Sequence, residues 1–218
     1  MKGNNTEGQS AKHSKILDAA AEAFMDLGYT ATSIDSIADR MQVTKGNIYY
    51  YYRSKMDLFF AVHRRAMESN INLIRPRAED NSLSAERRLY TMVCAHAMQM
   101  MEQTSYQRVT VQGVDMYQTA STTTAQREEL QELVDLRAEY EELFTQTIVE
   151  GVKNGSMRQA DPRLTTRTLL GSLNWITMWY RQRETDTRAD REQIAAEIAD
   201  QLLFGVVSST TDPSRGGT

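Results

Sequence analysis

The chain contains very little cysteine and proline. Its 218 residues include one cysteine, Cys94, and three prolines. A single thiol excludes an internal disulfide framework and any zinc site built from several cysteines. No apolar run approaches the ~20 residues that a membrane-spanning helix needs. The first ten residues are polar and lack the apolar core of a secretory signal, so we expect a cytoplasmic protein with a loose N-terminal arm.

Strand patterns are equally scarce. We find no convincing alternation of apolar and polar residues, whereas the helix formers Ala, Leu, Glu, Gln, Met and Arg dominate the composition. The sequence therefore predicts an all-α fold. A hydrophobic fraction of 40% is enough for one large domain, or for a small head on a larger body.

A pair of short helices is predicted near the N-terminus. In the stretch TSID, Thr32 fits the N-cap of the first helix, with Asp35 at its third position. After a tight break, Thr44 fits the N-cap of the second helix. Two short helices joined in this way form the helix-turn-helix pattern. In that geometry the second helix enters the major groove of DNA, and its first residues meet base edges.

The first residues of the second helix suit that position. Asn47 can pair bidentately with adenine, and Lys45 can reach guanine or a phosphate. Between them, Gly46 has no side chain and lets the backbone come close to DNA. The pattern therefore predicts that this helix contacts bases.

Four consecutive tyrosines follow, and helical phase separates them. Tyr52 lies four residues after Ile48, so both should face the core of the head. Tyr49 and Tyr50 lie on other faces, where their hydroxyls can donate to phosphate oxygens. Lys55 begins the next helix, whose free N–H groups also favour a phosphate. The predicted DNA contacts are Ser33, Thr44, Lys45, Gly46, Asn47, Tyr49, Tyr50 and Lys55.

The local charge favours the same interpretation. From Arg40 to Arg65 the chain holds six basic residues and one acid, Asp57, which is a local charge of +5 in a chain whose net charge is −4. A compact basic patch on an acidic protein is typical of a DNA-binding head. The alternative is a solvated basic helix face that has no nucleic-acid partner.

The rest of the chain predicts a helical body. A long helix from Lys55 should end before Pro76. "NG" at 154–155 ends a later helix, and Asp161 fits the N-cap of the next. The helices that follow Pro76 are expected at 84–103, 105–118, 124–153, 161–182 and 188–207.

Methionine is abundant, with twelve residues, and several fall in the first two of these body helices. Because methionine fills irregular space, the cluster favours a cavity for an apolar ligand, with a few polar groups among aromatic ones. The alternative is that these methionines only pack in the core. The predicted pocket residues are Met98, Met101, Val109, Val114, Tyr117, Tyr140, Phe144, Asn174, Trp175 and Trp179.

The last two helices carry a larger apolar face than packing on one subunit requires, and two alanines would allow close approach of a second backbone. Pairing with the same helices of another copy would give a four-helix bundle about a two-fold axis. The alternative is that these helices pack only on their own body. The predicted dimer contacts are Leu169, Leu173, Ile176, Ile194, Ala195, Ile198, Ala199, Leu202 and Val206.

Patterns for catalysis and metal binding are absent from the sequence. His13, His63 and His96 are scattered, and none pairs with another histidine or with Cys94 at ligand spacing. There is no Gly-rich phosphate loop, and no nucleophile has a base partner. We therefore expect no enzyme activity, no cofactor and no metal.

Residues 12–62 resemble the DNA-binding head of the tetracycline-repressor (TetR) family. The resemblance lies in the stretch ILDAAAEAFMDLGYTATSIDSIADRMQVTKGNIYYYYRSKMDLFFAV. It implies an Ω-shaped dimeric regulator with about nine helices per subunit and a ligand pocket in the C-terminal body. The chain departs from the family at Tyr52, where phenylalanine is commoner, so the extra hydroxyl must find a partner or reach solvent.

The body from Arg137 to Arg181 is similar to the TetR-type regulators that respond to acyl-CoA and steroid-acid CoA thioesters. The shared features include Arg137, Tyr140, Glu141, Phe144 and the stretch NWITMWYR. After Arg181 the sequence departs from the Pro-x-Gly that this group usually has. The resemblance implies an effector of the CoA-thioester class.

Together these features predict a ligand-responsive transcriptional regulator. We expect a homodimeric repressor that binds a palindromic operator in double-stranded DNA and is released by an apolar effector. One alternative is a repressor that senses drugs or other xenobiotics. Another, of a different class, is a helical small-molecule carrier or enzyme without DNA binding, although such a protein has no use for the basic patch. The expected parts are an arm at 1–10, a helix-turn-helix DNA-binding domain at 11–60, a ligand-binding and dimerisation domain at 61–207 and a disordered tail at 208–218.

Overall fold

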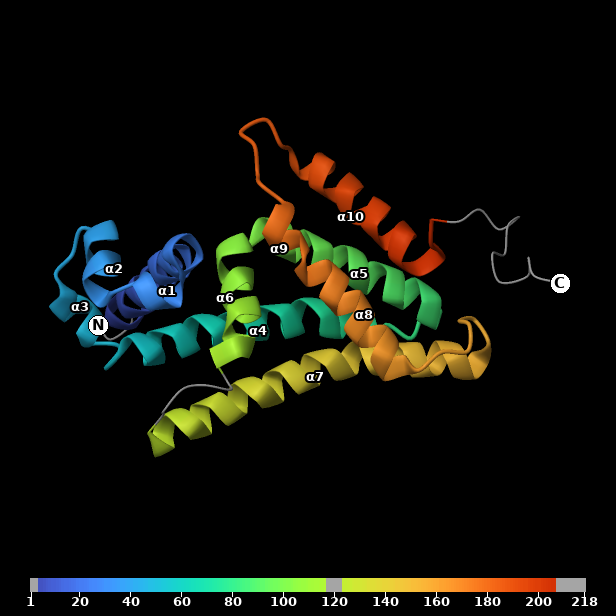
Figure 1. Cartoon of the computed structure of the whole chain (residues 1–218), viewed down its shortest axis with the longest axis horizontal. Coiled ribbons are helices and arrows are strands. Elements are labelled where there is room, and N and C mark those ends of the chain that lie inside the picture. Colours follow the sequence, from blue (N-terminus) through green and yellow to red (C-terminus); the bar gives the residue numbers. More distant parts are fainter. Residues whose placement is uncertain (1–3, 117–122, 207–218) are drawn as a thin grey trace.

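The computed structural model describes residues 4–116 and 123–206, with side chains for 11–113 and 123–206. Every regular element in these residues is a helix, which confirms the predicted all-α fold (Figure 1). None of the described helices is long and apolar enough to cross a bilayer. In chain order they are α1 (Asn4–Ala31), α2 (Ile34–Arg40), α3 (Lys45–Tyr49), α4 (Lys55–Ala78), α5 (Ala85–Glu102), α6 (Thr104–Met116), α7 (Thr124–Asn154), α8 (Pro162–Asn174), α9 (Ile176–Trp179) and α10 (Arg188–Phe204).

Helices α1, α2 and α3 pack with the first turns of α4 to form a head at one end of the molecule (Figure 1). Its core contains the fully buried side chains of Ile16, Phe24, Ile37 and Phe59. The head begins earlier than predicted, because the backbone at 4–10 is helical where the sequence suggested a loose arm.

The turn between α1 and α2 differs from the predicted one. Ser33, not Thr32, is the N-cap of α2: its hydroxyl accepts from the Ser36 N–H at 3.0 Å, and the Ser36 hydroxyl accepts from the Ser33 N–H at 3.0 Å. Thr32 is buried, and its hydroxyl donates to the Gly28 carbonyl at 2.7 Å. Gly28 has φ +76°, a conformation that glycine adopts without strain, and α1 bends there.

The body is built around a second core. Helices α4 and α7 run side by side, α10 lies along α5, and α8 packs against both α5 and α7 (Figure 1). The core between them includes the buried side chains of Met92, Met100, Phe144 and Leu173. Four of the abundant methionines, Met67, Met92, Met100 and Met101, are therefore buried in the core of the body.

The sequence predicted that helix α4 ends before Pro76, but the helix continues to Ala78. Proline removes one backbone hydrogen bond from a helix, and only two residues follow Pro76, so the loss is confined to the last turn. The end of the helix is also held from outside, because the buried Arg88 of α5 donates to the Ala78 carbonyl at 2.7 Å.

The helix predicted at 161–182 is broken into α8 and α9. The Thr177 hydroxyl donates to the Asn174 carbonyl at 2.8 Å, and the Met178 N–H donates to the Trp175 carbonyl at 2.9 Å. The Asn174 carbonyl therefore accepts from a side-chain hydroxyl, where a regular helix would have the Met178 N–H. That N–H bonds instead to the carbonyl three residues before it, as in a 3₁₀ turn. The chain leaves helical geometry after α9.

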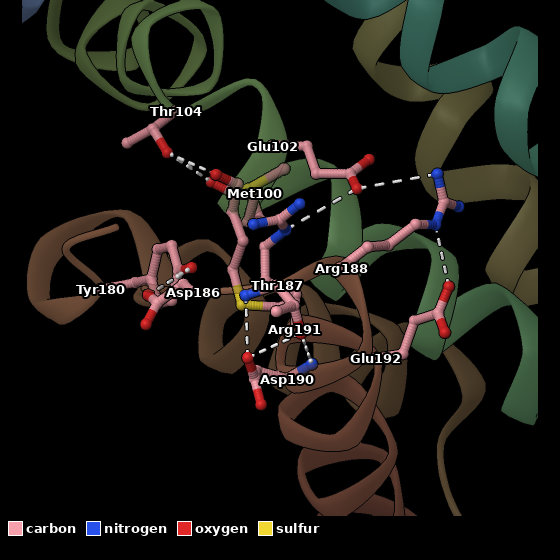
Figure 2. A network of polar contacts seen from close by, with 11 residues as sticks. Met100, Glu102, Thr104, Tyr180, Asp186, Thr187, Arg188, Asp190, Arg191 and Glu192 are labelled. Carbon is pink, nitrogen blue, oxygen red and sulfur yellow. Dashed lines mark hydrogen bonds and ion pairs between the residues drawn. The ribbon is translucent and has the colours of Figure 1, made fainter. Parts of the chain in front are cut away.

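A polar network fixes the start of α10 against the end of α5 (Figure 2). Arg188 and Arg191 of α10 lie 4.0 Å and 3.8 Å from the Glu102 carboxylate. Thr187 and Asp190 form a capping box at the start of α10, and the hydrogen bonds from Thr187 lower the pKa of the Asp190 carboxyl. Opposite charges and a cap therefore add to the apolar contacts between the two helices.

Helix α6 stands between the head and the body and contacts α1, α4, α5 and α9 (Figure 1). Toward the head, the Tyr106 hydroxyl donates to Asp18 of α1 at 2.6 Å, and the guanidinium of Arg65 lies 5.4 Å from the Tyr106 ring centroid. Toward the body, Arg108 Nε donates to the Thr177 carbonyl of α9 at 3.0 Å. This short helix is thus bonded to both parts.

Candidate functional site

The start of α3 forms an open face on the head. Thr44 is its N-cap, as predicted, and the next two residues, Lys45 and Gly46, are exposed. Tyr49 and Tyr50 are 49% and 72% exposed. All five therefore remain accessible to a duplex, and their backbone, ammonium and phenol groups are the kinds that position proteins on DNA.

Lys45 and Ser33 both keep a group that DNA can contact. Lys45 Nζ lies 3.4 Å from the Asp35 carboxylate, and the two side chains are 64% and 66% exposed. Exposed ion pairs of this kind contribute ~0–1 kcal/mol, so DNA can displace Asp35. The exposed Ser33 hydroxyl accepts from a backbone N–H, and its own hydrogen can still be donated to a phosphate.

Asn47 is held from two sides. Lys12 of α1 donates to Asn47 Oδ1 at 2.8 Å, and Asn47 Nδ2 donates to Thr44 Oγ1 at 3.4 Å. Because an ammonium group can only donate, the contact with Lys12 fixes which end of the amide is the oxygen. The sequence did not predict Lys12, since 35 positions separate it from Asn47 and no helical period joins them.

Asn47 is predicted to contact one base of the duplex. We expect Lys12→Met to reduce the preference of the head for that base about fivefold, since an exposed hydrogen bond contributes about 1 kcal/mol. Competition gel shifts with duplexes changed at single positions measure this preference. Lys15→Met, at an exposed lysine of the same helix, is the matched control. An equal loss of affinity on every duplex, with a salt dependence that corresponds to about one phosphate contact fewer, would mean that Lys12 contacts the DNA backbone instead.

Tyr52 lies in the core with Ile48, as helical phase indicated, and is 7% exposed. Its hydroxyl has a partner, because it lies 2.6 Å from His13 Nε2, and the two rings stack with centroids 5.5 Å apart. Burial raises the pKa of Tyr52 to about 12. The departure from phenylalanine at this position is therefore accommodated by a histidine of α1.

Lys55 occupies a different place from the predicted one. Its ammonium donates to the carbonyl oxygens of Tyr29 and Thr32, each at 2.7 Å, and that of Thr30 lies 3.3 Å away. Burial lowers its pKa. Lys55 thus anchors the junction of α1 and α2, and a phosphate would have to replace one of these carbonyls.

A cavity of about 390 Å³ lies within the body, at the small end of the ~300–1,000 Å³ typical of ligand sites. Helices α4, α5, α6, α7 and α8 all contribute to it. Its lining is more polar than the methionine cluster suggested. The lining residues are His63, Met67, Asn70, His96, Gln107, Thr110, Val111, Arg137, Tyr140, Glu141, Leu170 and Asn174.

Of the predicted pocket residues, Tyr140 and Asn174 line this cavity. Phe144 is buried one turn along from Tyr140, with the ring centroids 5.5 Å apart. The prediction was wrong for Trp175 and Trp179, which are 62% and 50% exposed. The physical reason is helical phase, because their neighbours in the chain fill the core and leave the tryptophans on the outside.

The other predicted pocket residues also lie elsewhere. Met101 and Val109 are fully buried, the first in the core of the body and the second in the core of the head, and the half-buried Met98 packs against the body core. The methionines at these positions follow the alternative of core packing. Val114 and Tyr117 lie outside the described side chains.

Two buried histidines stand in the cavity wall. Burial lowers the pKa of His63 and of His96 to about 4, and the charge of Arg137 adds to the effect on His63. Both rings are therefore neutral at pH 7. His96 Nδ1 lies 2.5 Å from the Tyr140 hydroxyl, and His96 Nε2 lies 3.3 Å from Asn174 Oδ1.

A reciprocal amide pair forms the wall between α4 and α6. Asn70 Nδ2 donates to Gln107 Oε1 at 2.9 Å, Gln107 Nε2 donates to Asn70 Oδ1 at 2.8 Å, and both side chains are buried. The helices also approach closely at Gly113, where an added Cβ would come within 2.5 Å of His63 Nδ1. An occupant of the cavity would thus touch the helix that bonds to the head through Tyr106.

Sequence reasoning missed most of the lining, although helical phase offered a signal. His63, Met67 and Asn70 are spaced i, i+4 and i+7, which places them on one face of α4. Polar residues on an inward face indicate a polar cavity or a buried network. Which faces of five helices meet around one space is a tertiary property, and the pattern of a single helix does not contain it.

The predicted dimer contacts are mostly internal. The prediction was wrong for five residues, which are buried in the core of their own protomer: Leu169, Leu173, Ile176, Ala195 and Ala199. An apolar stripe does not reveal whether it faces its own body or a partner. Three more are half-buried and pack against the same core, namely Ile194, Ile198 and Leu202. Val206 is 84% exposed.

A different apolar surface is exposed on α8 and α9. It consists of Leu164, Gly171, Trp175, Met178 and Trp179, which we call the outer face of α8–α9. At Gly171 an added Cβ would meet no atom within 4 Å. Large exposed apolar side chains that gather on one side of a helix favour a contact with another molecule.

Metal ligands do not gather in the part of the chain that the structure describes: no group of three or more His, Cys, Asp or Glu side chains there could hold an ion. Cys94 is half-buried beside α10, 3.9 Å from the Ala195 carbonyl, and burial raises the pKa of its thiol. A thiol of this kind is not a reactive nucleophile.

Comparison with known families gives two matches that together cover most of the chain. Residues 82–206 match the family described as "Tetracyclin repressor-like, C-terminal domain", and residues 16–62 match "Bacterial regulatory proteins, tetR family". The first match alone covers more than half of the chain, and the second coincides with the head.

Individual relatives agree with these matches over nearly the full length. A protein of Rhodococcus jostii named HTH-type transcriptional repressor KstR2 is 27% identical over 182 residues, which are 82% of this chain and 84% of that protein. The TetR family regulator PfmR of Thermus thermophilus has a TM-score of 0.74 at 25% identity, covering 88% and 99%. AibR, solved with isovaleryl coenzyme A and operator DNA, has a TM-score of 0.71 at 23% identity, covering 88% and 98%.

Proposed function

Because the chain belongs to the tetR family of bacterial regulatory proteins, we propose that it is a homodimeric transcriptional repressor whose affinity for an operator is lowered by an effector in the body cavity. In this proposal α1–α3 and the start of α4 bind double-stranded DNA. The remaining helices bind the effector and a second copy of the chain. The chain acts as a regulator and catalyses no reaction.

The observation that carries the proposal is the open start of α3. Lys45 and Gly46 are exposed, and Asn47 is pre-oriented by Lys12 and Thr44. A helix presented in this way can enter a major groove, and a dimer would place two such helices in grooves ~34–36 Å apart.

The cavity supports the regulatory part of the proposal. Its wall includes Gln107 of α6, and the neighbouring Tyr106 bonds to Asp18 of α1 in the head. An effector that favours a different position of α6 therefore changes the placement of the head. Such couplings are typically ~1–3 kcal/mol and reciprocal, so operator DNA must weaken effector binding by the same factor.

A CoA thioester is the effector class that we propose. AibR, which shares this fold, is known in complex with isovaleryl coenzyme A and operator DNA. The body of this chain also has Arg137, Tyr140 and Glu141, which the resemblance to CoA-responsive regulators singled out, in the lining of its cavity.

The DNA-binding part is tested by Asn47→Ala. We expect a loss of ~1–3 kcal/mol in operator affinity together with relaxed sequence choice at one position, because a bidentate base contact is removed. Gel shifts on a duplex selected from genomic fragments, and on its single-base variants, measure both. Tyr49→Phe, which removes a phosphate-directed hydroxyl, should weaken all duplexes equally. If Asn47→Ala binds every duplex as the unchanged protein does, α3 does not contact bases.

A further inference from the structure

We propose that Asn174, oriented by His96 and Tyr140, binds a neutral carbonyl oxygen of the effector, so that the cavity accepts acyl groups in ester, thioester or amide linkage and rejects free carboxylic acids. The inference rests on the proposed function, because it takes the body cavity as the effector site. It adds the chemical group that the cavity recognises and the residue that recognises it.

The hydrogen bonds that link Tyr140, His96 and Asn174 can have only one set of donors and acceptors. Asn174 Oδ1 can only accept, so His96 Nε2, 3.3 Å away, must carry the ring hydrogen. A neutral imidazole then has a bare Nδ1, which accepts from the Tyr140 hydroxyl at 2.5 Å. The tautomer of His96 is thereby fixed by its two neighbours.

This arrangement leaves one donor for a ligand. His96 occupies the oxygen of the Asn174 amide, and no described residue accepts from its Nδ2. Asn174 is half-buried and lines the cavity. Its amide hydrogens are therefore placed to donate to an acceptor on the occupant, whereas its oxygen is already engaged. In the wall formed by α4 and α6, the amides of Asn70 and Gln107 already use one N–H and the oxygen of each on the other.

The charge of the cavity wall decides between a carbonyl and a carboxylate. Its two charged side chains, Arg137 and Glu141, are opposite in sign and bonded to each other at 3.1 Å. His63 and His96 are neutral, as described above. A carboxylate buried against such a wall lacks a counter-charge and is strongly disfavoured, whereas a carbonyl oxygen needs only a hydrogen bond.

The size of the cavity limits what enters. About 390 Å³ suits a compact acyl group and its carbonyl, and is too small for a whole CoA thioester. The side chains of Arg137 and Glu141 are 41% and 28% exposed, so this pair stands where the cavity meets solvent. The larger part of a thioester would remain on that side, outside the cavity.

Isothermal titration of the full chain without DNA tests the inference. The probes are butyryl-, isovaleryl- and octanoyl-CoA, the sodium salts of the three matching acids, and CoA alone. We expect at least one thioester to bind at least tenfold more tightly than its acid and than CoA. Equal binding of acid and thioester, or no binding of any thioester, overturns the inference.

Substitutions then identify the group responsible. Asn174→Asp keeps the shape but has no amide hydrogens, and should weaken thioester binding at least tenfold. Asn174→Leu should do the same, and Asn81→Leu, at an exposed asparagine between α4 and α5, should change nothing. Tyr140→Phe frees the His96 tautomer and should reduce the preference for thioester over acid without abolishing binding. Unchanged thioester binding in both Asn174 variants overturns the assignment.

Release of a labelled operator duplex, measured separately by fluorescence polarisation, distinguishes the two levels of the argument. Binding of thioesters without release of DNA contradicts the proposed repressor mechanism and leaves the role of Asn174 intact. Release by acids and thioesters alike supports the repressor mechanism and contradicts the role of Asn174.

Discussion

Acidification from pH 6.5 to pH 4 should lower the free energy of unfolding by about 3 kcal/mol for each of the two buried histidines, His63 and His96. The pKa of each is lowered from 6.5 to about 4 in the folded chain. One pKa unit corresponds to about 1.4 kcal/mol, and the difference of about 2.5 units gives the magnitude. Since native domains are stable by ~5–15 kcal/mol, the two histidines together amount to a large share.

The direction follows from proton linkage. Between pH 6.5 and pH 4 the unfolded chain binds protons on these histidines, and the folded chain does not. Stability therefore rises with pH in this window and is lost as the pH falls. Well above pH 6.5 both states leave the rings neutral, so the two histidines cause no further change.

Urea denaturation at half-unit steps between pH 7.5 and pH 4 measures the effect. His96→Gln can accept from Tyr140 and donate to Asn174 without titrating, so its stability should fall less steeply over this range, by about 3 kcal/mol in total. His13→Gln removes the exposed histidine of the head, which bonds to Tyr52, and is the comparison variant for the slope with pH and not for the absolute stability. If the profile of His96→Gln parallels that of the unchanged protein, His96 is not held neutral by burial.

Trp175→Glu should convert the dimer to a monomer and lower the affinity for a palindromic operator about 30-fold or more. Trp175 follows the last residue of α8 on the outer face of α8–α9 and is 62% exposed, and Leu164 and Trp179 of the same face are 65% and 50% exposed. Tryptophans at interface centres contribute ~2 kcal/mol or more, and every ~1.4 kcal/mol is tenfold in affinity. A buried carboxylate would add its own desolvation cost.

Sedimentation velocity and operator titrations check this expectation. A half-site duplex separates the two possible causes of weak binding, because a monomer with an intact head should bind it as tightly as the unchanged protein does. Leu83→Glu places the same charge on an exposed leucine between α4 and α5 and should leave the dimer intact. A Trp175→Glu chain that still sediments as a dimer would place the interface elsewhere.

The head was predictable from the sequence because its signals are local. Thr44 caps α3, and the i, i+4 pair of Ile48 and Tyr52 faces inward, since each depends only on residues within one turn. The cap of α2 moved by one residue because Thr32 found carbonyl partners within α1. Lys12 was missed for the opposite reason, since its partner Asn47 is close only after folding.

The body was predictable as a set of helices but not as a set of faces. Leu173 and Trp175 are two positions apart, and one is fully buried while the other is mostly exposed. The sequence predicted Leu173 as a dimer contact and Trp175 as a pocket residue. The difference arises from which side of α8 meets the body core, and that depends on the packing of distant helices. The same limit hid His63 and Asn70, which become cavity groups only when α6 covers α4.

Helix α4 runs without a break from the head to the cavity, so a tilt of the helix moves both ends together. Lys55 near its start holds the carbonyls at the end of α1, and Asn70, fifteen positions later, lines the cavity. At ~1.5 Å per residue the two are about 22 Å apart along a single rod, so a tilt of about 5° at the cavity swings the other end by about 2 Å. In a two-fold assembly both α4 helices tilt, and the distance between the two heads would change by several ångströms. The heads would then no longer match two consecutive major grooves.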